Sequence, residues 1–363
     1  MANIFKTFTD DDIQTTKTLL HEAIPLTGSL ISGTYGTWPN EENIKNYSHG
    51  MFQSVYDYPY LSSSANQIFD ITVGYSANSG LSGTTNVTQQ EKKINIYNQM
   101  AAVLMGHDVS GNIRDFDQDG NIAGGGTKHL NCIFLNFARL LVKDEIKKGS
   151  FTLKLGCGPV WDQAMDSDDE LVITDSGAEN NYRVNSPAGE YGILSCSLGG
   201  QHEPGSDGGQ VGLIFYQAGV VVLSSSVFTG ETSGALEQGS RMDYPNHVGG
   251  VISQVLTGSS ISGAADAIRH RINDISFNNT TELNSTIHFC RANAKEFNYS
   301  SNPTYLSSSK IRTKNNSLDN PTAYVTTVGL YSQDNELLAV GKLSEPLKKS
   351  SDTEFTLRLR LDY

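Results

Sequence analysis

The chain has 363 residues, of which 26 are basic and 39 acidic, so that its formal net charge at pH 7 is −13. This charge argues against a nucleic-acid partner, because contacts to phosphates need a concentrated positive surface. Charged residues make up only 18% of the chain, below the ~25% of typical soluble domains. Together with abundant Gly, Ser, Thr and Asn, this composition favours strands joined by polar loops.

The beginning of the chain lacks a basic and then apolar signal segment, and no apolar run approaches the ~18 residues of a membrane-spanning helix. We therefore expect no membrane partner. Four cysteines stand far apart, without the short spacings of a metal site or a disulfide framework. They predict free, buried thiols in a reducing compartment. These residues are Cys132, Cys157, Cys196 and Cys290.

The first predicted element is a helix that begins after Thr9. A threonine followed by three acidic residues, Asp10–Asp12, satisfies the free backbone donors of a first turn and complements the helix dipole. Pro25 would end this helix. After a loop region rich in Gly, Ser and Tyr, alternating apolar residues over 67–75 predict a strand.

Two further helices are expected before Gly149. Residues Thr88–Glu91 form a capping box, and the helix that follows would end near Gly106. A helical pattern then covers 131–147, with lysines in its last turns that are favourable for the helix dipole. A strand is expected next, over 151–155.

The second half of the chain is expected to be rich in strands. Loops dominate 156–210, which contains the acidic run Asp166–Glu170. A β-branched apolar stretch over 211–228, interrupted by glycine, favours a buried hairpin. Residues 249–275 form a weaker helical region, and β-structure is expected from Ser276 onward.

The last forty residues carry the clearest pattern. Apolar runs over 323–331 and 337–343 flank a polar turn and predict a hairpin. From Glu354, polar and apolar residues alternate to the end of the chain, which predicts a half-buried strand. We expect its apolar side chains to lie in a core or an interface. They are Phe355, Leu357, Leu359, Leu361 and Tyr363.

These elements predict an α+β protein with N-terminal helices and strands, and with a C-terminal antiparallel β-sheet or sandwich. A chain of this length exceeds the size at which one core keeps growing, so two domains, or one core with large insertions, are expected. The composition divides the chain into a helix-rich region 1–155, a loop-rich insertion 156–210 and a β-rich region 211–363.

One stretch matches the first half of a calcium-binding loop. Its oxygen ligands would be Asp115, Asp117 and Asp119. Gly120 stands at the position of the turn glycine, but Gly126 occupies the twelfth position, which should supply a bidentate carboxylate. A partial calcium site and a simple polar turn are therefore both open. A calcium-dependent hydrolase that uses the same aspartates is a further alternative.

No sequence motif indicates a catalytic function. The glycine-rich segment 124–128 resembles a phosphate-binding loop only superficially, because its threonine precedes its lysine. The eight histidines lack metal-binding spacings and are expected at the surface or in structural roles. No serine lies in a G-x-S-x-G elbow. We therefore predict that the chain is not an enzyme and needs no cofactor apart from the calcium considered above.

Several aromatic residues suggest contact surfaces. Tyr56, Tyr58 and Tyr60 alternate with Asp and Pro, and tyrosines among small polar residues are typical of protein interfaces. Packing inside their own domain explains the same composition equally well. Trp38 and Trp161 would stack on sugars if the chain were instead a carbohydrate-binding or receptor-binding module.

Three C-terminal segments, residues 297–305, 323–331 and 336–349, resemble structural proteins of contractile-tailed phages. The resemblance is to the baseplate-wedge class of marine and T4-like myophages, and the apolar block 213–223 matches more weakly. It implies a virion protein, assembled in the host cytoplasm, that forms a homo-oligomer and binds other tail or baseplate proteins. Neck, fibre-attachment and receptor-binding tail roles are the alternatives.

Overall fold

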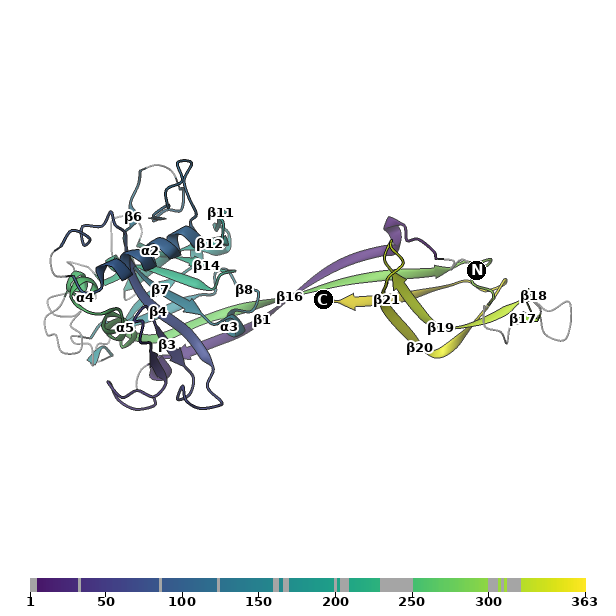
Figure 1. Ribbon diagram of the computed structural model, residues 1–363, viewed down its shortest axis with the longest axis horizontal. Helices are drawn as coiled ribbons and strands as arrows, with labels where there is room; N and C mark the ends of the chain where they lie inside the picture. The colour runs from purple at the N-terminus through teal and green to yellow at the C-terminus, as the bar shows by residue number, and fades with distance from the viewer. Residues whose placement is uncertain are drawn as a thin grey trace. The chain divides into compact units, whose positions relative to one another are not determined.

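The computed structural model describes residues 5–31, 34–84, 87–122, 125–158, 163–165, 170–198, 201–202, 209–228, 251–299, 306–307, 310–311 and 321–363. Contacts divide the chain into two compact units, which we call unit 1 (residues 1–19 and 282–363) and unit 2 (residues 20–281). Two strands, β1 (Ile13–Thr27) and β16 (Ile272–Ala292), run from one unit into the other (Figure 1). This division differs from the three regions drawn from composition.

Unit 2 is built on an antiparallel β-sheet in which neighbouring strands are often distant in the chain. From β16 the sheet continues through β9 (Thr152–Gly156), β10 (Glu170–Thr174), β12 (Gly189–Leu198), β14 (Gln210–Phe215), β15 (Val220–Ser224), β7 (Asn131–Phe137), β4 (Gln67–Tyr75), β3 (Gln53–Tyr56) and β2 (Ile44–Asn46). The short strands that join it are β8 (Glu145–Ile146), β11 (Arg183–Ser186) and β13 (Gln201–His202). A separate small sheet consists of β5 (Phe116–Asp117) and β6 (Lys128–His129).

Helices are few among the described residues. The longest is α2 (Gln90–Leu104), which packs along β4 (Figure 1). The other α-helices are α1 (Gly28–Ile31), α3 (Arg139–Val142), α4 (Ile252–Gly258) and α5 (Ile261–Arg269). Single turns of 3-10 helix occupy Asp10–Asp12, Ser176–Glu179 and Ser225–Phe228. The protein is therefore mainly β.

The hydrophobic core lies in unit 2. Its side chains come largely from the central strands β4, β7, β14 and β15 and from helices α2, α4 and α5. Every residue of β15 is buried, as expected of a central strand that is covered on both faces. All members of the core cluster fall between Leu26 and Phe277, so no described residue of unit 1 belongs to it.

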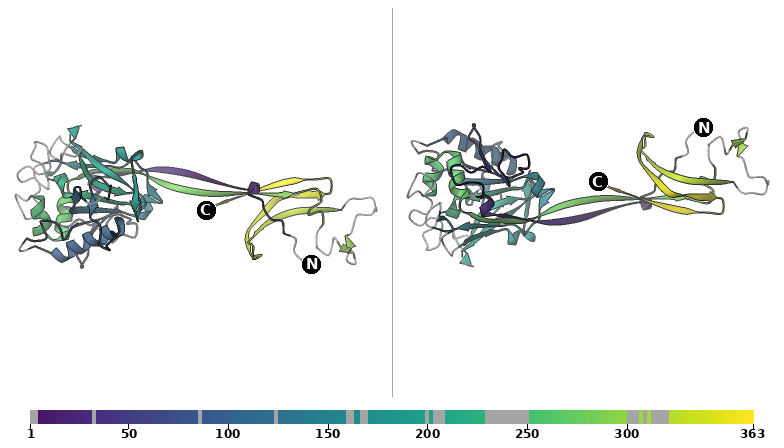
Figure 2. Two further views of the ribbon diagram at one scale, coloured as in Figure 1. Left: turned by 90° about the horizontal axis from the view of Figure 1, so that it is seen from above. Right: turned by 90° about the horizontal axis from the view of Figure 1, so that it is seen from below.

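Unit 1 consists mainly of long strands. β21 (Phe355–Asp362) pairs with the second half of β16, from Ser285 opposite Asp362 to Ala292 opposite Phe355. β19 (Thr322–Tyr331) and β20 (Leu337–Ser350) lie side by side as a two-stranded sheet (Figure 2). The short strands β17 (Leu306–Ser307) and β18 (Lys310–Ile311) form another pair. The predicted C-terminal hairpin and final strand are thus confirmed.

The prediction of an N-terminal helical part is wrong. After Thr9 only the turn Asp10–Asp12 forms, and the chain continues as strand β1. The Asp12 carboxylate does accept hydrogen bonds from the backbone nitrogen and the hydroxyl of Thr9, so the capping signal closes a single turn. The β-branched threonines that follow favour a strand, and pairing with β16 outweighs the cap.

The expected helix over 131–147 is also wrong. Strand β7 occupies the first half of this segment and is followed by the short helix α3 and strand β8. β7 pairs with β15 along one side and with β4 along the other, and its residues Cys132–Leu135 are all buried. Hydrogen bonds from two neighbouring strands and burial on both faces override the helical spacing of its apolar residues.

The helix expected after Thr88 is confirmed as α2, and Gly106 follows it with a φ of 74°. Its predicted capping box does not form. Gln89 adopts the left-handed conformation at the N-cap position without a side-chain cap. The Thr88 hydroxyl instead donates to the Gly258 carbonyl over 3.0 Å, which connects the start of α2 to the end of α4.

The remaining element predictions agree with the structure in most places. The strands expected over 67–75 and 151–155 are β4 and β9, and the apolar stretch 211–228 forms the hairpin β14–β15. The weak helical region 249–275 contains α4 and α5. Residues 170–198, which were expected among loops, instead contribute strands β10, β11 and β12.

Candidate functional site

A polar and aromatic surface lies where β2, β3 and β4 meet in unit 2. Lys45, Ser54 and Asp70 stand opposite one another in the registers of these three strands. Directly opposed residues of an antiparallel sheet point to the same face. One side of this part of the sheet therefore carries an ammonium, a hydroxyl and a carboxyl group in a row.

Aromatic rings surround Lys45. Its ammonium lies 4.8 Å from the ring centroid of Tyr47 and 5.9 Å from that of Tyr60, within the range of cation–π attraction. The ring centroids of Tyr56 and Tyr60 are 6.4 Å apart. The Ser54 hydroxyl oxygen lies 3.3 Å from the Tyr47 hydroxyl oxygen. We call this group the polar–aromatic face, which comprises Lys45, Tyr47, Ser54, Tyr56, Tyr60, Gln67 and Asp70.

Asp70 is the acidic group of the polar–aromatic face. Its carboxylate accepts hydrogen bonds from the Ser54 hydroxyl and, over 2.6 Å, from Gln67 Nε2. The pKa of Asp70 is raised overall, because burial raises it more than these two hydrogen bonds lower it. Burial also raises the pKa of Tyr56 to about 12, with smaller contributions from Tyr47 and from the charge of Asp70. The phenol of Tyr56 therefore stays protonated at neutral pH and can donate a hydrogen bond.

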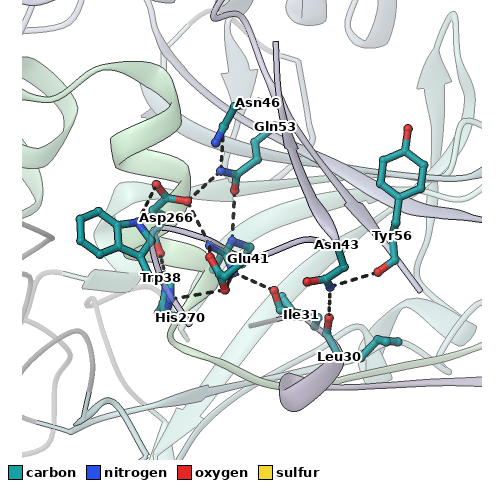
Figure 3. A network of polar contacts seen from close by, with 11 residues as sticks. Leu30, Ile31, Trp38, Glu41, Asn43, Asn46, Gln53, Tyr56, Asp266 and His270 are labelled. Carbon is teal, nitrogen blue, oxygen red and sulfur yellow. Dashed lines mark hydrogen bonds and ion pairs between the residues drawn. The ribbon is translucent and has the colours of Figure 1, made fainter. Parts of the chain in front are cut away.

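A buried ionic network holds the opposite side of the same strands (Figure 3). Arg269, the last residue of α5, is fully buried and forms a bidentate ion pair with Glu41. The distances are 2.8 Å from Nη1 to Oε1 and 2.5 Å from Nη2 to Oε2. Its Nη2 also lies 3.0 Å from Asp266 Oδ1, and its Nη1 donates to the Ile31 carbonyl over 2.8 Å. These bonds satisfy the guanidinium in a place where water cannot.

Gln53 connects this network to β2 and β3. Its Oε1 accepts from Arg269 Nε over 3.1 Å, and its Nε2 donates to Asp266 Oδ1 over 2.7 Å and to Asn46 Oδ1 over 3.0 Å. Figure 3 shows Gln53 between Asn46 and Asp266. Gln53 and Ser54 are adjacent on β3, so their side chains point to opposite faces. The network thus positions β2 and β3, two of the three strands that carry the polar–aromatic face.

This network was not predicted from the sequence, because the Arg269–Arg271 segment has the charge of a surface turn. A usable signal was the spacing of the apolar residues of α5. Arg269 stands eight residues after Ile261, on the same helical stripe as the buried residues Ala265 and Ile268. His270, beside it, has its Nδ1 2.7 Å from the Asp266 carbonyl oxygen, and burial and then Arg269 lower its pKa.

Each of the three aspartates of the expected calcium loop bonds a protein group. Asp117 is buried and pairs with Lys128 at 2.6 Å. Asp115 accepts a serine hydroxyl bond over 3.0 Å, and Asp119 accepts from the backbone and side-chain nitrogens of Asn121. Within the described ranges, no group of three or more potential metal ligands occurs. Calcium binding by these aspartates stays a prediction, since the described residues do not form a set of ligands around one position.

The residues predicted to make contacts lie in both units. In unit 2, Tyr58 is 50% exposed and its ring centroid is 5.7 Å from that of Tyr35, while Tyr60 is 37% exposed. In unit 1, the apolar residues of β21 are half-buried and alternate with exposed polar ones, whereas Tyr363 is 74% exposed. Trp38 donates to Asp266 Oδ2 over 3.4 Å. Trp161 and residues 166–169 of the acidic run lie outside the described residues.

One buried lysine was not predicted. Lys93 of α2 is fully buried, and its Nζ donates to the carbonyls of Thr88, Leu256 and Ser259 over 2.8, 2.6 and 2.8 Å. Burial lowers the pKa of Lys93 to about 8. The three carbonyls lie at the start of α2 and around the end of α4. The hydrogen bonds of this ammonium therefore link the two helices.

None of the four cysteines, all of which the structure describes, forms a disulfide. The prediction of burial is confirmed for Cys132, Cys157 and Cys196, whereas Cys290 is only partly buried. Burial raises the pKa of Cys132 and of Cys290, which disfavours the reactive thiolate form.

Comparison with known proteins identifies no relative of this chain. No protein-family model, curated protein or solved structure gives a match. In the described part of the chain, no helix has the length and apolar character needed to cross a membrane.

Proposed function

We propose that this chain is a structural subunit of a virion, a baseplate-wedge component of a contractile phage tail, that binds itself and neighbouring tail proteins. The observation that carries the proposal is the exposure of large apolar side chains on unit 1. Among the described residues, fourteen of the 25 exposed large hydrophobic side chains belong to this unit, which has 101 of the 363 residues. Exposed apolar side chains that gather into a contiguous patch mark a site of protein association.

The sequence resemblance supports the same proposal. Its three segments, residues 297–305, 323–331 and 336–349, all belong to unit 1. The part of the chain that resembles phage tail proteins is therefore also the part whose apolar surface needs covering. A subunit of a large assembly requires such a surface, because its neighbours complete the burial.

Immunogold electron microscopy of purified virions tests this proposal. With an antibody to the chain, we expect gold at one fixed position along the tail, and none with pre-immune serum. Label found only in the host cytosol and never on virions would rule the proposal out.

A second candidate function is carbohydrate binding by the polar–aromatic face. The observation that favours it is the row of Lys45, Ser54 and Asp70 beside tyrosine rings. Tyrosine rings can pack against the apolar faces of sugar rings, while the charged and amide groups bond sugar hydroxyls. On a glycan array, the chain should bind at least one glycan class, and Tyr60→Ala should lose that signal while Tyr182→Ala, in another exposed position, keeps it. Absence of any glycan signal would remove this candidate.

A further inference from the structure

We propose that strands β19 and β20 of unit 1 form the surface through which two copies of this chain associate. The inference rests on the proposed function, since it names the surface for the self-association proposed there. It commits to a second copy of the chain as the occupant of this surface.

The described residues of unit 1 form no apolar interior of their own. Only four of its described hydrophobic residues are buried, and none of them joins the core cluster of the protein. They are Ile287, Ala292, Ala323 and Leu330. A two-stranded sheet such as β19–β20 is marginally stable in water unless another layer covers it. The described part of unit 1 therefore has too few buried apolar side chains to form a core without a partner surface.

The uncovered face of β20 can be identified from its neighbours. A Cβ atom added at Gly341 would lie 3.0 Å from Leu359 Cδ1, so Gly341 and residues two positions away face β21. Val340 belongs to the other face and is 50% exposed, and Leu338, which lies at an irregularity of the register between Leu337 and Ala339, is 68% exposed. On β19, Gly329 pairs with Val340, so Tyr331, two residues further on, lies on the same face; it is 46% exposed, with the Phe5 ring centroid 4.9 Å from its own.

The exposed apolar surface is large enough for a specific interface. Six of the fourteen exposed large hydrophobic residues lie on β19 and β20, and each is between 37% and 68% exposed. In a pair of identical copies both chains supply these six side chains, which together present on the order of 1,000 Å², the area that a specific association needs to bury.

The distribution of charge points to a second copy as the partner. Unit 1 contains 12 basic and 12 acidic residues, so unit 2 carries the entire formal charge of −13. A neutral surface with both signs can pack against its own copy without net repulsion. A strongly charged partner would instead select for an excess of the opposite charge, which unit 1 does not have.

Sedimentation velocity of the full chain with two matched double variants tests this inference. One variant combines Leu338→Asp with Val340→Asp in unit 1. The control combines Leu61→Asp with Val109→Asp, which are 87% and 103% exposed in unit 2. We expect the wild type and the control to associate equally, and the dissociation constant of the unit 1 variant to rise by roughly 100-fold or more, because charges would enter the centre of an apolar interface.

Two outcomes would overturn the inference. One is a wild-type chain that stays monomeric up to its solubility limit, and the other is a unit 1 variant that associates as the wild type does. If circular dichroism shows that the variant is unfolded, hydrogen exchange of the wild type decides instead. Amides of 322–350 should gain protection as the chain concentration rises while those of unit 2 do not, and exchange independent of concentration in 322–350 would reject the surface.

The test separates this inference from the proposed function. A chain that is monomeric in solution but labelled on virions would reject only the second-copy surface. A chain that self-associates through β19 and β20 but is absent from virions would reject only the virion role.

Discussion

Arg269 illustrates how one charged side chain can fix the position of a pair of strands. It is fully buried, and its guanidinium bonds Glu41, Asp266 and Gln53 at once. A buried ion pair adds little net stability compared with apolar residues, but removal of one partner leaves the other charge without compensation. The network therefore gives the β2–β3 pair a defined position more than it adds to the free energy of folding.

We predict that Arg269→Met lowers the free energy of unfolding by about 3–5 kcal/mol, because the Glu41 carboxylate is left buried and unpaired. The double variant Arg269→Met with Glu41→Met should recover part of this loss. Arg139→Met, at an exposed position, should change it by less than about 0.5 kcal/mol. Chemical denaturation of the full chain measures all three, and an equal effect of the buried and exposed substitutions would contradict the account.

Lys93 gives a prediction about pH. Its pKa is lowered by burial from an ordinary value of 10.5 to about 8 in the folded chain. Between these two values the unfolded chain holds a proton that the folded chain has released, so the stability contribution of Lys93 rises as the pH increases from about 8 to about 10.5. Below pH 8 both forms are protonated, and the folded state bears the full cost of the buried charge.

The free energy of unfolding, measured against pH for the wild type and for Lys93→Met, checks this prediction. The difference between the two curves should shift in favour of the wild type by about 1–3 kcal/mol across this range, less than the full pKa change implies because three carbonyls favour the ammonium. Lys92→Met, an exposed neighbour, serves as the control. Parallel curves for Lys93→Met and the wild type would contradict the buried ammonium.

At the scale of elements, prediction from the sequence succeeded where the local residue pattern favours the same structure as the pairing with distant strands. β4, the hairpin β14–β15 and strand β21 have alternating or continuous apolar residues that their positions in sheets require. β1 and β7 have helical caps or helical spacing, but partners far away in the chain turn them into strands. Pairing between β7 and β15, more than eighty residues apart, leaves no trace in either segment alone.

The same limit applies to the candidate sites. Tyr56, Tyr58 and Tyr60 were predicted from local composition, and two of them are exposed. Lys45 and Asp70 were not predicted, since only the registers of β2, β3 and β4 bring them beside Ser54. Asp115, Asp117 and Asp119 were predicted to form one calcium-binding loop. In the structure they bond Ser76, Lys128 and Asn121, respectively, and Asp119 also interacts with Asp117.

We predict that deletion of Leu359–Tyr363 unfolds the second half of β16 and prevents self-association. The deletion removes the strand partners of Ser285–His288 and two half-buried leucines. Hydrogen exchange should show loss of protection over 285–292, while peptides from unit 2 remain unchanged. Arg358→Gln, which changes an exposed side chain of the same strand, should leave exchange as in the wild type. Retained protection after the deletion would show that β21 is dispensable.

At the scale of the whole molecule, charge and apolar surface are divided between the two units. Unit 2 holds the hydrophobic core and the net charge of −13, whereas unit 1 is neutral and exposes apolar side chains. A high net charge keeps a protein soluble through repulsion between its copies. Under the proposed self-association, this division would let unit 2 oppose nonspecific aggregation while unit 1 forms the contact.

The division predicts how association responds to salt. Raising the ionic strength screens repulsion between the acidic units, so the dissociation constant should fall several-fold between low and high sodium chloride. Burial of apolar surface is not weakened by this screening. Sedimentation velocity across a salt series measures the trend, and association that weakens with salt would indicate an interface held by ion pairs instead.

The central claim is that this chain is a structural subunit whose apolar strands are covered by neighbouring subunits. Cryo-electron microscopy of intact virions tests this claim most directly. We predict density for the chain in the tail, with Leu338 and Val340 of β20 buried against a second copy. Virions that lack this density, or that contain the chain with β19 and β20 facing solvent in every copy, would contradict the claim.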